Sequence, residues 1–124
     1  MQQLVFIQHG KSFTTSLILS ELFKKRHGNI VTHIRNMKCI NGYKEANYIL
    51  KHYINPMTGQ INPYYLISRD GFGNLLTYFN WELIAAYSIN VWDAFEQVNS
   101  HIRQLERERV TLEISSTGMF VRVI

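Results

Sequence analysis

The hydrophobic positions nearest the N-terminus predict a hairpin followed by a helix. Two short strand-like runs flank the tripeptide His9-Gly10-Lys11, as in a small β-hairpin. Apolar side chains at helical spacing then follow Ser16, which we expect to be the N-cap, with Thr15 as the alternative. This pattern predicts a helix over about residues 16–25, and Gly28 is expected to end it in the left-handed conformation.

A second helix is predicted over about residues 29–38. Ile30, Ile34 and Met37 recur at i, i+4 and i+7, so they would face the core. Side chains that can all hydrogen-bond occupy the opposite face: Asn29, Thr32, His33, Arg35 and Asn36. A face that only keeps a helix soluble more often carries Glu and Lys, whereas this mixture is typical of side chains that contact base edges. These five residues are therefore the candidate base contacts.

The middle of the chain predicts a protruding hairpin. Residues 43–50 fit either a weak helix or a strand. After them, two runs rich in Tyr and Ile flank the turn-forming segment 55–60, which predicts a hairpin over residues 51–67. Pro56 and Pro63 cannot donate ladder hydrogen bonds, so both are expected at strand ends or at a sheet edge.

The remaining residues predict a helix, a much longer helix and a second hairpin. Ser68 is a candidate N-cap, and Asp70 lies favourably in the first turn of the shorter helix. Residues 80–109 contain neither Gly nor Pro and predict a helix roughly 45 Å long, whereas alternation over 110–124 predicts the hairpin. Residues 1–79 are expected to form a winged helix-turn-helix-like domain, on which the long helix packs. All of these parts are expected to belong to a single domain.

Apolar residues recur along the long helix with a heptad-like period. We expect them to form the interface of a homodimer, made by Ile84, Val91, Val98, Ile102 and Leu105. A two-fold dimer would match a two-fold operator. The alternative is that the rest of the same chain, or the C-terminal hairpin, covers this stripe.

The composition argues against several classes of protein. With 46% hydrophobic and 18% charged residues among 124, the chain is expected to fold. It has no apolar run near the ~20 residues of a membrane span and no signal-peptide pattern, and its single cysteine, Cys39, fits a reducing cytoplasm. The histidines lack the spacing of metal ligands, and no nucleotide-binding or hydrolase motif is present. We therefore expect a cytoplasmic protein with no cofactor, no metal and no enzymatic activity.

Positive charge is concentrated in the first half of the chain. The net charge is +4, but residues 1–69 carry nine Lys and Arg against two acids, or +7. Residues 70–124 carry four Arg against seven acids, or −3. This separation indicates that the first half faces a polyanion. The candidate phosphate contacts all come from that half: Lys11, Lys24, Lys25, Arg26, His27, Lys38 and Lys51.

The order of the predicted elements indicates an α+β, winged helix-turn-helix-like domain. Two short helices are joined by a tight basic turn and are followed by a hairpin. In such a domain the second helix enters the major groove of duplex DNA, and cations in the turn and on the wing hold phosphates. The hairpin over residues 51–67 would be the wing.

Three segments of the chain carry a specific combination of motifs. The first reads TTSLILSELFKKRHGNIVTHIRNM from residue 14, the second NPYYLISRDGF from residue 62, and the third VWDAF from residue 91. They resemble the signature of the phage regulatory protein Rha family, in which TTS and K-R-H-x-N precede P-x-Y-x-L-T-R-D-G-F and Y-I-x-A-F. The resemblance covers about residues 14–98 and implies a bacteriophage or prophage regulator that binds DNA.

Two functions are compatible with these patterns. The first is a Rha-type transcriptional regulator that binds double-stranded DNA. The second is a phage protein-binding module, such as an antirepressor or an inhibitor of a host defence protein, that uses the same fold to engage a protein. The family's basic G-K-K-A element is replaced here by Trp81-Glu82-Leu83-Ile84, which favours the second function, whereas the +7 half favours the first.

Overall fold

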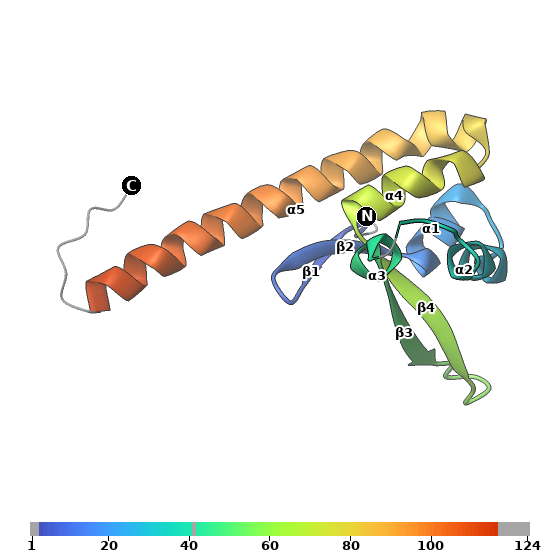
Figure 1. Ribbon diagram of the computed structural model, residues 1–124, viewed down its shortest axis with the longest axis horizontal. Helices are drawn as coiled ribbons and strands as arrows, with labels where there is room; N and C mark the ends of the chain where they lie inside the picture. Colours follow the sequence, from blue (N-terminus) through green and yellow to red (C-terminus); the bar gives the residue numbers. More distant parts are fainter. Residues whose placement is uncertain (1–2, 41, 117–124) are drawn as a thin grey trace.

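The computed structural model describes residues 3–40 and 42–116 of the chain. Within them, a four-stranded antiparallel sheet has the strand order β1-β2-β4-β3. Its strands are β1 (Phe6–Gln8), β2 (Lys11–Thr15), β3 (Tyr48–Ile54) and β4 (Ile61–Ile67). The end of β2 pairs with the end of β4, and this pairing joins the two hairpins into one sheet. Figure 1 shows the paired β3 and β4, the β3–β4 ribbon, extending away from the helices.

The described residues also form five α-helices and one 3₁₀ turn (Figure 1). The helices are α1 (Ser16–Phe23), α2 (His27–Arg35), α3 (Tyr43–Asn47), α4 (Arg69–Leu75) and α5 (Trp81–Ser116), and the 3₁₀ turn after α4 is η1 (Leu76–Tyr78). A mixed architecture with an antiparallel sheet and a long C-terminal helix is thereby confirmed.

The first hairpin and α1 form where the sequence predicts them. His9 and Gly10 both have positive φ and make the turn between β1 and β2, since a two-residue turn of this hand matches the twist of the strands. Thr15, the alternative candidate, is the N-cap of α1: its hydroxyl accepts a hydrogen bond from the Ile18 amide at 3.1 Å. Ser16 is instead the first residue of the helix and is fully buried.

The prediction that Gly28 ends α1 is wrong. Lys24 adopts the left-handed conformation, with φ 52°, and donates its backbone N–H to the Ser20 carbonyl. The Ser20 hydroxyl also donates to the Lys25 carbonyl at 2.6 Å, which stabilises the turn at this point. The chain therefore turns before it reaches Gly28, which lies in the first turn of α2.

Both interpretations of the ambiguous segment 43–50 are partly right, because α3 passes directly into β3 at Tyr48. The β3–β4 ribbon then pairs in register from Tyr48↔Ile67 to Ile54↔Ile61. Pro63 lies inside β4 and pairs with His52 of β3 on one side. On its other side β4 has no neighbour at this point, because β2 pairs only with Leu66 and Ile67. The missing N–H of Pro63 therefore faces an edge of the sheet, as predicted.

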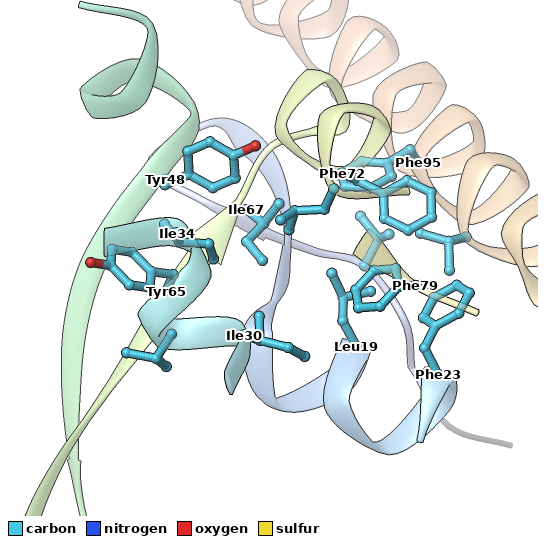
Figure 2. Packing of buried hydrophobic residues seen from close by; sticks show 14 residues of the cluster. Leu19, Phe23, Ile30, Ile34, Tyr48, Tyr65, Ile67, Phe72, Phe79 and Phe95 are labelled. Atoms are coloured by element: carbon cyan, nitrogen blue, oxygen red, sulfur yellow. The ribbon is translucent and has the colours of Figure 1, made fainter. Parts of the chain in front are cut away.

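One hydrophobic core joins the sheet to α1, α2, α4 and α5 (Figure 2). Phe23 stacks on Phe79 with 4.6 Å between ring centroids, and Phe72 lies 6.4 Å from Phe95. Because Val91 and Phe95 are both fully buried, α5 is part of this core rather than an appendage.

The burial of α5 changes the predicted dimer interface. Val91 is enclosed by its own chain, so it presents no surface to a second copy. Ile84 and Val98 are partly buried against the same core. Farther along the helix, Ile102 is half-buried and Leu105 is exposed. A dimer through α5 stays a prediction that depends mainly on these last two residues.

The prediction of a C-terminal hairpin over residues 110–124 is wrong for residues 110–116, which form the end of α5. The helix therefore has 36 residues and is about 54 Å long. No Gly or Pro interrupts it, so the helix continues where alternating apolar residues had suggested a strand. Residues 117–124 lie outside the described part of the chain. Across residues 3–40 and 42–116, no helix combines the length and apolar character that a membrane span needs.

Candidate nucleic-acid interface

Helix α2 has one apolar face and one polar face. Ile30, Val31 and Ile34 are buried in the core, where Figure 2 shows Ile30 and Ile34 on the side of Tyr65. The candidate base contacts lie on the other face. His33 is half-buried, and the other four are exposed: Asn29, Thr32, Arg35 and Asn36. The helix contains no acidic residue. Its free surface therefore consists of hydrogen-bonding and cationic groups.

The turn before α2 carries three consecutive cations. Lys24 and Arg26 are exposed, and Lys25 is half-buried. Arg26 is the N-cap residue of α2, and no side chain caps the helix there through a hydrogen bond. The N-terminus of a helix attracts anions through these amides and through the helix dipole. The cations and the helix end thus favour an anion at the same place.

The sequence of the chain matches a known protein family over most of its length. Residues 14–113 match the protein-family model described as Phage regulatory protein Rha. The chain belongs to the Rha family. The match extends past the motifs that carry the resemblance and includes most of α5.

A relative of this Rha-family chain occurs in Salmonella phage P22, where it is described as an uncharacterized 22.8 kDa protein in the gp15-gp3 intergenic region. It is 24% identical over 120 residues, which cover 90% of this chain and 60% of the phage P22 protein. The chain thus spans less than two thirds of that relative's length. No solved structure matches the chain.

The Arg-Asp-Gly-Phe motif of Rha proteins has a structural position in this chain. The Ser68 hydroxyl accepts a hydrogen bond from the Gly71 amide at 3.1 Å, which caps α4 as predicted. The Arg69 guanidinium lies 5.4 Å from the centre of the Trp92 ring, and Phe72 is fully buried in the core. The motif therefore attaches α4 to α5 and to the sheet.

Tyr78, in η1, was missed by the sequence analysis although it contacts three candidate site residues. Its ring stacks on His33 with 4.0 Å between centroids and an interplanar angle of 19°, and Lys25 Nζ lies 4.3 Å from the same ring centre. Its hydroxyl donates to the Asn29 carbonyl at 3.3 Å. Tyr78 thus holds the basic turn and α2 together. Sequence patterns give no signal for it, because these partners are about 50 residues away along the chain.

The Tyr78 stack predicts a measurable change in His33. Burial first, and then the positive charge of Lys25, lower the pKa of His33 from its usual 6.5. Replacing Tyr78 by Ala exposes the imidazole to water, so we expect the pKa of His33 to rise toward 6.5. Titration of the His33 ring protons by NMR measures this directly. Tyr78→Phe keeps the ring and should leave the pKa lowered; equal pKa values in Tyr78→Ala and the wild type would contradict the stack.

His27 is directed inward rather than toward the basic turn. Its Nε2 is 2.9 Å from the Ser16 hydroxyl, which also accepts the Tyr65 backbone N–H at 2.9 Å. Burial lowers the pKa of His27 from its usual 6.5, so the ring is mainly neutral at pH 7. Its ring therefore connects α2 to α1 and β4, and the structure does not place it with the exposed cations. In the described part of the chain, no three His, Cys, Asp or Glu side chains gather as metal ligands would.

The remaining candidate phosphate contacts are spread over the molecule. Lys38 is exposed shortly after α2, and Lys51 is half-buried on β3. Lys11 lies at the β1–β2 hairpin, where it lines a cavity of about 450 Å³ together with Arg69 and Arg103. In Figure 1 this hairpin extends to the left, whereas α2 lies at the right of the molecule. The structure thus brings Lys24, Lys25, Arg26 and the α2 face together and separates Lys11 from them.

Proposed function

We propose that this Rha-family protein is a phage regulator that binds double-stranded DNA through the exposed face of α2. The observation that carries the proposal is the acid-free polar face of α2 directly beside the cations of its N-terminal turn. An α-helix fits the major groove, where amide, hydroxyl and guanidinium groups distinguish base pairs. Cations and free helix amides at the N-terminus would hold the phosphates beside the groove.

In this proposal the basic turn and the helix have different tasks. Lys24, Lys25 and Arg26 supply affinity that does not depend on sequence. Arg35 is the strongest candidate for a base contact, because its exposed guanidinium can donate two hydrogen bonds to one guanine. The β3–β4 ribbon would be the wing of a winged helix-turn-helix-like domain, and binding near promoters would regulate transcription.

The salt dependence of binding tests this function. A random-sequence duplex is titrated with the wild-type protein between 50 and 200 mM salt, and the affinity is measured by fluorescence anisotropy. We expect a log–log slope of roughly −4.5, because the five candidate phosphate contacts other than Lys11 and His27 would release counterions in proportion. Absence of salt-sensitive binding would contradict the proposal and favour the protein-binding module instead.

We also propose that the protein is a homodimer through the outer part of α5. Ile102 and Leu105 lie one helical turn apart, and Leu105 is exposed. A second copy would cover these side chains, and its two-fold axis would place two α2 helices on one duplex. Sedimentation equilibrium measures the mass directly. A single species at the 14.6 kDa of one chain would contradict the dimer.

A further inference from the structure

The β3–β4 ribbon has an apolar face that continues past the core. Side chains that pair across two strands point to the same face, and successive residues alternate between faces. At the base of the ribbon both tyrosines are buried: Tyr48 points toward α4, where its hydroxyl donates to the Gly71 carbonyl, and Tyr65 lies beside α2 (Figure 2). The same face then carries Leu50, Ile54 and Ile61, which are 50%, 68% and 68% exposed, with the His52–Pro63 pair between Leu50 and the other two. An apolar line, interrupted by the exposed His52, thus runs from the core to the end of the ribbon.

The loop at the end of the ribbon, residues 55–60, has a hydrogen-bonded backbone and presents another apolar side chain. Met57 is 92% exposed. The Asn55 side-chain oxygen accepts the Met57 amide at 2.9 Å, and the Asn55 carbonyl accepts the Gly59 amide at 2.8 Å. Gly59 has φ 73°, a conformation that glycine adopts without strain. Hydrogen bonds within the loop therefore hold the backbone at Met57, from which its exposed side chain projects.

The charge of the ribbon is compatible with a polyanion. Residues 48–67 contain no Asp or Glu, and they contain Lys51 and His52. The exposed loop also carries uncharged hydrogen-bonding groups, on Asn55, Thr58 and Gln60. Proteins that enter the DNA minor groove combine such groups with apolar wedges of Ile, Leu, Met or Pro. This is the composition of the ribbon end.

The structure points to a DNA-bending activity of this ribbon. We propose that its end enters the minor groove next to α2 and inserts Met57, supported by Ile54 and Ile61, into one base step. The stacked bases separate at that step, and the duplex kinks. This inference rests on the proposed DNA binding, because the α2 face and the basic turn would hold the duplex while the ribbon deforms it. In Figure 1 the end of the ribbon and α5 lie on opposite sides of the molecule, so α5 does not cover the ribbon end.

The shape of the apolar line favours DNA over a protein partner. A stable protein–protein interface buries roughly 800 Å² on each partner. The apolar side chains here form a narrow line along a two-stranded ribbon, and the loop around Met57 is polar. A narrow wedge with polar flanks matches a groove between two phosphate backbones.

The test measures bending separately from binding. The probe is a 30-base-pair duplex that the wild-type protein enriches from a random pool, with a fluorescent donor at one end and an acceptor at the other. Energy transfer at saturating protein reports the bend, and anisotropy reports the affinity. The wedge variants are Met57→Ala and the pair Ile54→Thr/Ile61→Thr, which keeps β-branched residues in register. Ile89→Ala is the matched control, because Ile89 is 64% exposed on α5.

We expect the wild type and Ile89→Ala to bend the duplex by roughly 20–90°. Each wedge variant should lose half or more of the change in energy transfer, while its affinity stays within about fivefold, because these substitutions remove no candidate phosphate contact. Binding without a bend, or a bend that the wedge variants preserve, overturns this inference and leaves the proposed function intact. Failure of the wild type to enrich or bind any duplex overturns both proposals. Circular dichroism checks that each variant is folded.

Discussion

Replacing Lys24, Lys25 and Arg26 together by Ala is expected to weaken binding to duplex DNA about 100-fold near physiological salt, since each lost phosphate contact costs about 1 kcal/mol. The slope of log affinity against log salt should also become less steep by about 2.7, because three fewer counterions are released. Anisotropy titrations at several salt concentrations give both quantities. Sequence preference should persist, since the face of α2 that would contact bases is unchanged.

A charge-matched variant makes this result specific. Replacing Arg103, Arg107 and Arg109 by Ala also removes three positive charges, but from the exposed outer part of α5. If the basic turn holds the phosphates, this control should lose only a few-fold in affinity through the change in net charge. Equal losses in both triple variants would contradict a localised contact. Because Lys25 packs on Tyr78, its loss in the basic-turn variant can also change stability. The unfolding midpoint of that variant is therefore measured together with its affinity.

Replacing Gly71 by Ala is expected to destabilise the protein by about 3 kcal/mol, as overpacking of a closely packed site does. An added Cβ would lie 2.9 Å from the Asn47 backbone oxygen, 3.0 Å from the Tyr48 ring and 3.2 Å from Ile67. The Tyr48 hydroxyl also donates to the Gly71 carbonyl at 2.8 Å, so α4 cannot move outward without breaking this buried hydrogen bond. For a domain of this size, thermal unfolding should shift down by roughly 10 °C.

Gly28→Ala serves as the control, and it is expected to stabilise the protein rather than destabilise it. Gly28 lies in the first turn of α2, and a Cβ there meets nothing within 4 Å. Ala lowers the conformational entropy of the unfolded chain, so Gly28→Ala should stabilise the protein by about 0.5 kcal/mol. A Gly71→Ala variant as stable as Gly28→Ala would contradict the packing of α4 against the junction of α3 and β3.

The two faces of α2 could be predicted from the sequence because they depend on a local period. Ile30 and Ile34 recur at the spacing of a helix, and they are buried as that spacing requires. The β3–β4 ribbon could likewise be predicted, since its loop and its strand residues are neighbours in the chain. Caps were harder, because Thr15 and Ser16 both fit an N-cap and Gly28 fits the end of a helix although Lys24 takes that position. Only the observed hydrogen bonds select among them.

The sequence by itself determined the mixed α+β class, the order of most elements, the polar face of α2 and the motifs of the Rha family. Only the tertiary structure decided that Tyr78 holds Lys25 and His33, that His27 points inward to Ser16, and that Val91 belongs to the core. The physical reason is the range of the interactions. Helical and strand periods arise between residues a few positions apart, whereas these contacts arise where distant elements pack together.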